Sequence, residues 1–215
     1  MPRSNLSQNA NNLYFQECAK KGNYAGDLIA PLIRKLSSKY IGRKVLDVGA
    51  GSRALINLIP EAIGLDLVPK HPKIIKGNIA KIPFEDNYFD TVFAIEVLEH
   101  LDNETLKQGL KEVCRVLKKG SYFVITIPFK EKLEENMVIC PKCGFKFHRI
   151  GHNQSFSEIK IKNILEENNF KIIKIKIFPL GSMARHSFLK HFWQIFNKFN
   201  LGFRPSNLFV IASKK

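Results

Sequence analysis

Several features that define other classes of protein are scarce or missing in this chain of 215 residues. No apolar run approaches the roughly 20 residues that a membrane-spanning helix needs, and the best candidate, residues 122–129, has the length of a strand. The first 17 residues lack the apolar core of a secretion signal. Only two of the 4 cysteines, Cys140 and Cys143, are close in sequence, so a disulfide framework is not expected. These absences predict a cytoplasmic protein without a transmembrane segment.

Acidic residues are also scarce, with 19 Asp and Glu against 34 Lys and Arg, a net charge of +15. The imbalance is greatest in residues 160–215, which hold 11 Lys and Arg against 2 Asp and Glu. A basic segment of this kind is suited to RNA, an anionic membrane surface or a phosphorylated substrate. A solvated, lysine-rich surface explains the same composition equally well.

What the chain does have is a hydrophobic fraction of 45% and 17 Phe, enough for a packed interior. Strand-like and helix-like segments alternate, which predicts an α/β domain, residues 1–215, doubly wound around a mostly parallel sheet. We expect an N-terminal helical lid (1–39) and two insertions (131–153 and 179–206). The predicted strands are residues 44–48, 62–66, 73–76, 91–95, 122–127, 171–178 and 207–213. One main helix is predicted at residues 103–117 and is ended by Lys118, Lys119 and Gly120. The other is predicted at 157–169 and is capped by Ser155 or Ser157.

The most informative stretch is KVLDVGAGSRALINLIPEAIGLD, residues 44–66. It combines a strand containing Asp47, a tight turn at Gly49 and Gly51, a short helix, and a second strand that ends at Asp66. Glycines let a ligand lie against bare backbone beside a helix N-terminus, and an acid at the end of the second strand can accept ribose hydroxyls. The pattern predicts a cofactor that contains adenosine.

Two cofactor classes fit this turn. The order Gly49, Gly51, Ala54 satisfies a relaxed dinucleotide fingerprint. Asp47 argues against it, because a carboxylate there would repel a pyrophosphate but suits the amino group of an amino-acid moiety.

Four downstream motifs occur in order: GNIAKIPF at 77–84, NYFD at 87–90, VLEHL at 97–101 and VLKKG at 116–120. With the glycine turn, they resemble class I S-adenosylmethionine-dependent methyltransferases of type 11 over roughly residues 40–130 and again over 157–178. The resemblance implies a Rossmann-like fold with seven strands and S-adenosylmethionine as the cofactor.

The resemblance also assigns roles to residues. Asp47, Gly49 and Gly51 would hold the methionine end of the cofactor. Asp66 would accept the ribose hydroxyls, and Leu67 would pack on the adenine. Asn78 and Ile79 would read the adenine edge. Ile95 and Glu96 would line the cofactor after the fourth strand. Asn78 departs from the commoner aspartate, but its carbonyl oxygen can accept from the adenine amino group. Glu96 has an alternative reading as a charge at a helix N-terminus.

Methyl transfer needs a base only if the accepting atom carries a proton at neutral pH. His100 is the candidate, because imidazole titrates near that pH. A histidine with a structural hydrogen bond on a helix face is an equally good interpretation.

The insertion contains the pattern C-x2-C-x4-H-x3-H, formed by Cys140, Cys143, His148 and His152. Two thiolates and two imidazoles are a common tetrahedral zinc set, and the spacing resembles a zinc knuckle whose last cysteine is replaced by histidine. The pattern predicts a zinc loop after the fifth strand that shapes the acceptor site. A redox cysteine pair, or a half-site with the histidines facing the substrate, remains open.

The second insertion carries SFLKHFWQIFNKFN at residues 187–200, with aromatic residues at helical spacing and basic residues around them. Such a helix can lie in a membrane interface, cap a hydrophobic acceptor pocket, or pack on its own sheet. A peripheral membrane location is therefore one expectation.

The function predicted from sequence is a zinc-containing, S-adenosylmethionine-dependent methyltransferase that acts on a small-molecule, lipid-linked or glycan-linked acceptor. An RNA methyltransferase and a non-catalytic partner-docking module of the same fold are the alternatives, and a dehydrogenase is a distant one.

Overall fold

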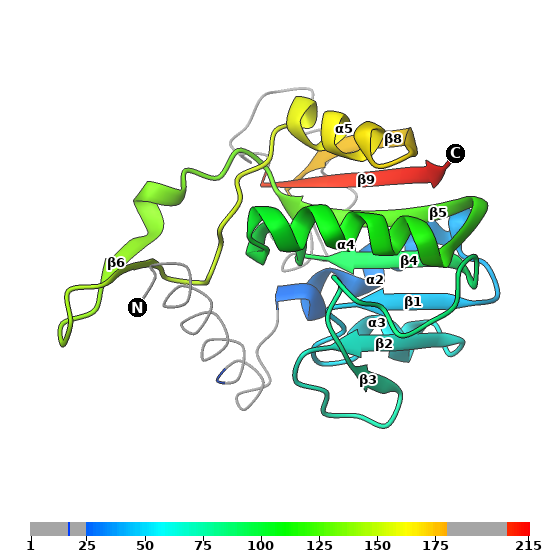
Figure 1. The fold of residues 1–215 in the computed structure, drawn as a ribbon, viewed down its shortest axis with the longest axis horizontal. Coiled ribbons are helices and arrows are strands. Elements are labelled where there is room, and N and C mark those ends of the chain that lie inside the picture. The colour runs from blue at the N-terminus through cyan, green and yellow to red at the C-terminus, as the bar shows by residue number, and fades with distance from the viewer. Residues whose placement is uncertain (1–16, 18–24, 180–205) are drawn as a thin grey trace, which may run out of the picture.

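The computed structural model describes residue 17, residues 25–179 and residues 206–215. Its main feature is a seven-stranded sheet in the order β3-β2-β1-β4-β5-β9-β8 (Figure 1). β9 runs antiparallel to β5 and β8, and the other described pairs of strands are parallel, which confirms the mostly parallel sheet. The strands are β1 Val45–Val48, β2 Ala62–Asp66, β3 Ile74–Lys76, β4 Phe89–Ile95, β5 Leu117–Pro128, β8 Phe170–Phe178 and β9 Asn207–Lys214.

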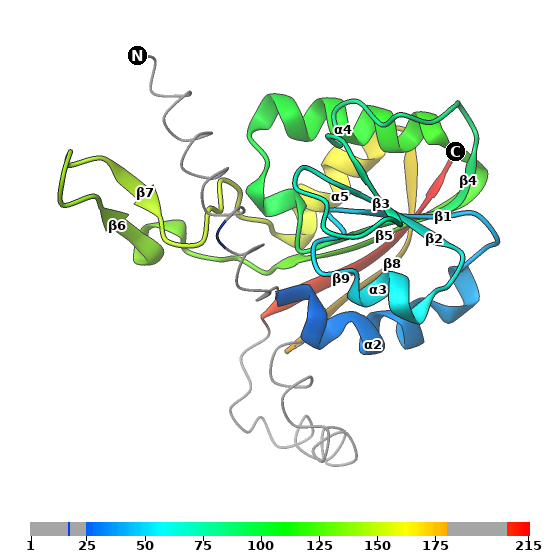
Figure 2. The ribbon, with the colours of Figure 1, turned by 90° about the horizontal axis from the view of Figure 1, so that it is seen from below.

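Helices cover both faces of the sheet, as the alternation of strands and helices predicts (Figure 2). On one face, α4 (Asn103–Val116) and α5 (Glu158–Glu167) pack their apolar sides with Leu46 and Val48 of β1. On the other, α2 (Ala25–Ser37) and α3 (Ala54–Leu58) pack with Val45. Successive strand residues point to opposite faces, so β1 contributes to both cores and is buried throughout.

The strand order reverses beside β1, and this reversal positions the candidate site. The chain runs outward through β2 and β3, then returns to pair β4 with the other side of β1. In open parallel sheets, ligands bind outside the carboxyl ends of the strands at such a reversal. The glycine turn after β1 and the segment after β4 therefore face the same space.

The predicted insertion leaves the sheet after β5 and returns before α5. Its ends lie side by side: Phe129 and Phe156 form an isolated bridge, and Lys130 N–H donates to the Phe156 carbonyl at 2.8 Å. Between them, β6 (Met137–Ile139) and β7 (Lys146–His148) form a hairpin that projects away from the sheet (Figures 1 and 2).

Two capping predictions have different outcomes. Ser157 caps α5, because its hydroxyl accepts from Lys160 N–H at 3.1 Å. Gly120 does not end α4, which is a correction: the helix stops at Val116, and Leu117 is already extended and paired with Phe89. Gly120 instead lies inside β5 with φ +77°. Pairing with β4 extends the strand back to the helix end.

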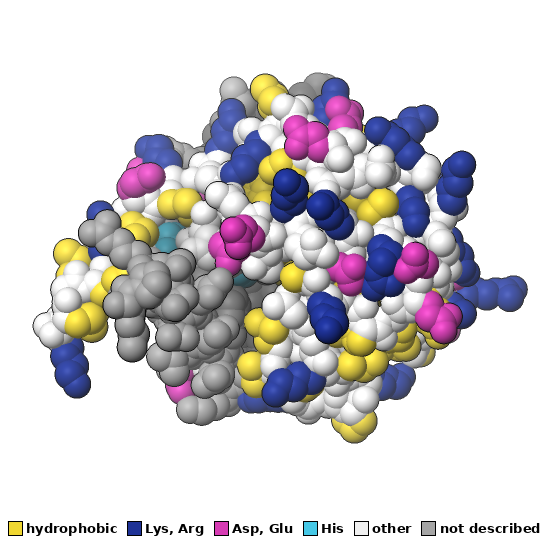
Figure 3. All heavy atoms as spheres, viewed as in Figure 1, with side chains coloured by type: hydrophobic (Ala, Val, Ile, Leu, Met, Phe, Trp, Pro, Cys, Tyr) yellow, Lys and Arg dark blue, Asp and Glu magenta, His cyan; other side chains and the backbone are white. Residues whose placement is uncertain are grey.

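In the described part of the chain, no helix has the length and hydrophobicity needed to cross a bilayer. Figure 3 shows Lys and Arg side chains scattered over one face and mixed with acidic ones. On this face, the arrangement is that of a solvated charged surface.

Candidate active site

Three acidic side chains come together at the carboxyl edge of the sheet. Asp47 lies in β1 opposite Gly64 and Phe93, Asp66 ends β2, and Glu96 directly follows β4. Parallel pairing brings the carboxyl ends of these strands to one edge. The sequence prediction that Asp47, Asp66 and Glu96 share a site is consistent with this arrangement.

The turn after β1 requires glycine for steric reasons. Gly49 has φ +70°, and a Cβ added to it would lie 2.5 Å from Val97 Cγ2. Its N–H donates to the Leu65 carbonyl at 2.7 Å, which holds the turn against the end of β2. Gly51 also has a positive φ, 47°. The turn thus offers backbone without side chains next to the segment that follows β4.

Asp47 is a buried acid whose pKa is strongly raised. It is 4% exposed and forms no ion pair with any described residue. Burial, and secondly the nearby charge of Asp66, raise its pKa to about 8. A cationic group bound at this edge would stabilise the carboxylate. The ammonium group of S-adenosylmethionine has the required charge, so Asp47 fits the predicted contact with the methionine end.

Asp66 connects the two strands at their ends. Its Oδ2 accepts from Gly51 N–H at 2.9 Å, and its Oδ1 accepts from Val68 N–H at 2.8 Å. Each carboxylate oxygen has a second lone pair for a ribose hydroxyl. Leu67 follows with 46% of its surface exposed, an unusual state for leucine that suits packing on an adenine ring.

The loop after β3 places the two predicted adenine contacts differently. Asn78 is exposed, and its Oδ1 accepts from Ala80 N–H at 2.9 Å, so one of its lone pairs is already used. Ile79 is 5% exposed, and its side chain lies against Gly109 of α4. Only the backbone of Ile79 is therefore suited to reading an adenine edge.

Glu96 has a left-handed backbone, with φ 56°, between the half-buried Ile95 and the short helix η2 (Leu98–His100). Both carboxylate oxygens accept from Asn207 Nδ2 at 3.1 Å, which connects β4 to β9. Burial raises the pKa of Glu96, and the hydrogen bond from Asn207 partly opposes this. It does not cap α4, because Asp102 has that role. The position fits the edge residue of the resemblance.

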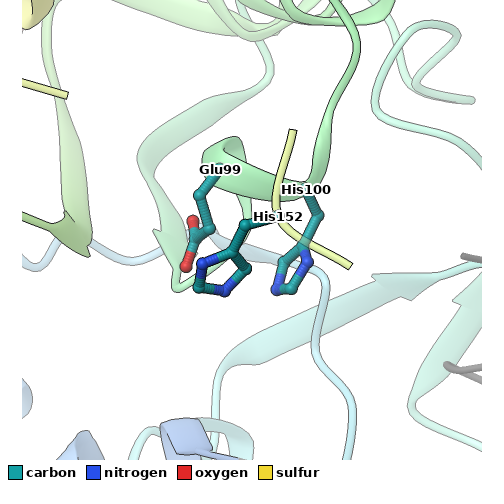
Figure 4. A group of neighbouring side chains, drawn as sticks. All are labelled: Glu99, His100 and His152. Atoms are coloured by element: carbon teal, nitrogen blue, oxygen red, sulfur yellow. The ribbon is translucent and has the colours of Figure 1, made fainter. Parts of the chain in front are cut away.

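A second group of polar side chains lies beside this edge and joins η2 to the insertion. Glu99, His100 and His152 each offer one ligand atom, all within 4.8 Å of one another. Figure 4 shows the Glu99 carboxylate and the two rings directed into one space. Backbone bonds hold the segments together: the Glu99 carbonyl accepts from Asn153 and Gln154 N–H at 2.7 and 2.9 Å.

Glu131 and His148 surround His152 on its other side. Glu131 Oε2 accepts from His152 Nδ1, and Glu131 Oε1 lies 3.4 Å from His148 Nε2. The two imidazole rings stack with centroids 4.9 Å apart. Burial by itself would raise the pKa of Glu131, but the hydrogen bond and charge of His152 and the charge of His148 lower it.

His100 has an environment that disfavours its predicted role as a general base. Burial, and secondly repulsion from His152, lower its pKa to about 3. Its Nδ1 lies 3.1 Å from the Gly151 carbonyl, a structural hydrogen bond of the kind in the alternative interpretation. A ring with so low a pKa is neutral at pH 7 and accepts a proton weakly.

The four predicted zinc ligands are not brought together. Among the described residues, no group of three possible ligands includes a cysteine. His148 pairs with Met137 at the base of the hairpin, whereas Cys140 and Cys143 lie at its tip. The last two residues before His148, Lys146 and Phe147, belong to β7, and each strand residue advances the chain by about 3.3 Å. Zinc binding by this set is not confirmed.

Comparisons with known proteins show what this chain resembles. Residues 46–125, less than half of the chain, match the family described as methyltransferase domain. This stretch is therefore similar to methyltransferase domains. A crystal structure of an S-adenosylmethionine-dependent methyltransferase from Archaeoglobus fulgidus is 25% identical, with a TM-score of 0.64 over 94% of this chain and 99% of that one. The match and the fold make this chain similar to S-adenosylmethionine-dependent methyltransferases.

Curated proteins that resemble this stretch are named for different substrates. A tRNA (carboxymethyluridine(34)-5-O)-methyltransferase of Arabidopsis thaliana is 26% identical over 51% of this chain and 29% of its own length. A sterol 24-C-methyltransferase of Schizosaccharomyces pombe is 34% identical over 38% of this chain and 27% of its own. The chain spans about half the length, or less, of the curated relatives that it matches.

Sequence reasoning missed Glu99 and Glu131 as site residues. Glu99 has a visible signal, because it precedes His100 in the VLEHL motif. Glu131 has none, since its partners are 17 and 21 residues away in the chain. The predicted lid lies mainly, and the aromatic helix at 183–203 entirely, outside the described residues, although α2 confirms a helix ahead of β1.

Proposed function

We propose that the chain is an S-adenosylmethionine-dependent methyltransferase that acts on a small-molecule, lipid-linked or glycan-linked acceptor. The observation that carries the proposal is the edge formed by Asp47, the Gly49–Gly51 turn and Asp66. It offers a buried carboxylate for an ammonium group, bare backbone, and a fixed acid for ribose hydroxyls. The bound cofactor supplies an electrophilic methyl group, and the chain has to hold it, align the acceptor and exclude water.

The acceptor side of the site is formed by the segment after β4 and by the insertion. The predicted cofactor edge consists of Asp47, the Gly49–Gly51 turn, Asp66 and Glu96, which is held by Asn207. Glu99, His100 and His152 lie beyond this edge. A compact, buried polar site of this kind suits an acceptor group that enters alone from solvent or from the end of a longer lipid or glycan. Such a site suits a small acceptor, or the end of a longer chain, better than a folded RNA.

The test is direct. A cell extract is incubated with the full chain and S-adenosylmethionine labelled in its methyl group, and mass spectrometry identifies labelled products. We expect a labelled product of low mass or a labelled lipid or glycan, absent with the Asp47→Asn variant. Cofactor binding without a labelled product would instead support the partner-docking alternative.

RNA is the second candidate acceptor, because residues 160–215 hold 11 Lys and Arg against 2 Asp and Glu, and because the Arabidopsis relative is named for tRNA. If RNA is the acceptor, the label appears in the RNA fraction, and the affinity for RNA falls steeply and linearly with salt on logarithmic axes. Weak binding with a shallow salt dependence would remove this candidate.

Membrane association and zinc binding by cysteine remain predictions. Co-sedimentation with anionic vesicles, compared between the full chain and a version without residues 183–203, tests the first. For the second, backbone hydrogen bonds from Cys143 and Lys142 lower the pKa of the Cys140 thiol, which favours the thiolate form that binds metals. Loss of stoichiometric zinc in Cys143→Ser would support the cysteine site.

A further inference from the structure

The group formed by Glu99, His100 and His152 has the composition and spacing of a metal site. One oxygen or nitrogen from each residue lies within 4.8 Å of the others, and their side chains converge in Figure 4. Glu99 is 1% exposed, and neither of its carboxylate oxygens has a hydrogen-bond partner among the described residues. A buried carboxylate without partners is costly, and a cation is the usual remedy.

The hydrogen bonds of the two imidazole rings favour the tautomer that a metal ligand requires, with the proton on Nδ1 and a lone pair on Nε2. A carbonyl oxygen only accepts, so the Gly151 carbonyl, 3.1 Å away, places a proton on His100 Nδ1. The ionised Glu131 likewise takes a hydrogen bond from His152 Nδ1. In each neutral ring the lone pair is then on Nε2. In metal-binding histidines, the N–H of the other ring nitrogen almost always donates to a carbonyl or carboxylate in this way.

We propose that Glu99, His100 Nε2 and His152 Nε2 bind one divalent transition-metal ion, with Zn²⁺ as the reference ion. Two imidazoles and one carboxylate are a familiar set for zinc and related ions. Three protein ligands leave a coordination position for water or for an oxygen of a substrate. The inference does not depend on methyl transfer.

Glu131 and His148 form a second possible group with His152, but their hydrogen bonds assign them a supporting role. His148 Nδ1 accepts from the His152 backbone N–H at 3.1 Å, so the proton of its neutral ring is on Nε2, where a metal would need a lone pair. Glu131 is oriented by Asn136 Nδ2 at 3.1 Å and fixes the ring of His152. These two residues position a ligand and do not themselves bind the ion.

The experiment uses the full chain, freed of metal with a chelator and then titrated with Zn²⁺ by calorimetry and with Co²⁺ by absorption spectroscopy. We expect one equivalent of each ion to bind. The Co²⁺ complex should show visible bands of a nitrogen and oxygen site without the intense near-ultraviolet band of a thiolate ligand. This spectrum separates the proposed site from a cysteine site in the unaltered protein.

Variants give the second readout. Glu99→Gln and His152→Gln should each weaken Zn²⁺ binding at least about 100-fold, and Glu131→Gln about 10–100-fold, as for outer partners of metal ligands. The double variant Cys140→Ser/Cys143→Ser and the control His71→Gln should bind as the unaltered chain does. Circular dichroism checks that each variant is folded.

The proposal is overturned if the unaltered chain binds neither ion. It is also overturned if the cobalt complex shows a thiolate band that disappears in the double cysteine variant. Should Glu99→Gln fail to fold, the spectrum of the unaltered chain and the affinity of His152→Gln decide the matter.

Discussion

At the scale of single residues, the buried acid Asp47 at the predicted cofactor edge destabilises the folded chain. Asp47 is buried beside Asp66 with its pKa raised to about 8. In the unfolded chain the same carboxyl ionises near its ordinary value of 3.8. The folded state therefore holds a proton that the unfolded state releases, and folding loses stability as the pH rises between these two values. A cofactor ammonium group would relieve this cost.

Replacing Asp47 with Asn tests this. Without cofactor, the variant should gain stability relative to the unaltered chain as the pH rises from 4 to 8, by about 1.4 kcal/mol for each pH unit. Urea unfolding across this pH range measures the difference. Affinity for S-adenosylmethionine should fall at least about 100-fold, because a buried ion pair loses one partner.

A matched control is Glu61→Gln, since Glu61 is an exposed acid that precedes β2, at the opposite end of that strand from Asp66. It should leave cofactor affinity unchanged. A stability difference between Asp47→Asn and the unaltered chain that stays constant with pH would contradict the raised pKa.

The glycine turn makes a second prediction at this scale. Gly49→Ala would place a Cβ 2.5 Å from Val97 Cγ2 in a backbone with φ +70°. We expect a loss of about 2–4 kcal/mol in the free energy of unfolding, from the left-handed conformation and the overlap together. Ala at Gly144, also at φ +70° but with no atom within 4 Å, should cost only about 1–2 kcal/mol. Equal losses would show that Val97 does not restrict the turn.

At the scale of elements, Arg115 of α4 holds the loop that carries the predicted adenine contacts. Its guanidinium donates to the carbonyls of Ile82 and Phe84 at 2.9 and 2.8 Å. It also pairs with Glu112, which accepts from Ile82 N–H at 2.8 Å. One helix thus fixes the loop after β3 through a planar set of donors.

Arg115→Lys keeps the charge but cannot make this set of bonds. The loop should loosen, which weakens S-adenosylmethionine binding several-fold and lowers the free energy of unfolding by about 1–2 kcal/mol. Calorimetry and urea unfolding measure the two effects. Lys132→Arg, at an exposed ion pair in the insertion, is a control that should change neither. Unchanged affinity in Arg115→Lys would separate the loop from the cofactor site.

In the hairpin β6–β7, strand pairing separates residues that the C-x2-C-x4-H-x3-H spacing places close together. A separation of four residues between Cys143 and His148 is typical of a knuckle only while the chain between them stays in a loop. Here Phe147 and Lys146 pair with Val138 and Ile139, and the strand carries His148 away from the thiols. Backbone pairing, which no ligand pattern reveals, decides which residues meet.

At the scale of the whole molecule, the proposed metal would connect the sheet to its insertion. Glu99 and His100 follow β4, whereas His152 belongs to the returning end of the insertion. Zn²⁺ at 100 times its dissociation constant should raise the melting temperature by about 5–10 °C. Hydrogen exchange should slow in residues 131–153 in particular. Uniform slowing, or none, would contradict a link at this place.

The sequence by itself determined the class of fold and predicted which residues share the carboxyl edge of the sheet. Strand-sized apolar runs alternate with helices, β1 is followed by a glycine, and β2 ends on an acid, so Asp47, Gly49, Gly51 and Asp66 lie together in any parallel sheet of this order. Asp47 and the two glycines are close in sequence. The position of Asp66 beside them follows from the right-handed connection between neighbouring parallel strands.

Only the tertiary structure decided the acceptor side. Glu99, Glu131 and His152 are separated by long stretches of chain, and they meet because the insertion returns across η2 and hydrogen-bonds to the Glu99 carbonyl. The cysteines, adjacent to the histidines in sequence, are carried to the hairpin tip. Proximity in sequence predicts contact within a turn or a helix, whereas contact across a returning loop depends on burial and backbone pairing that form only in the folded chain.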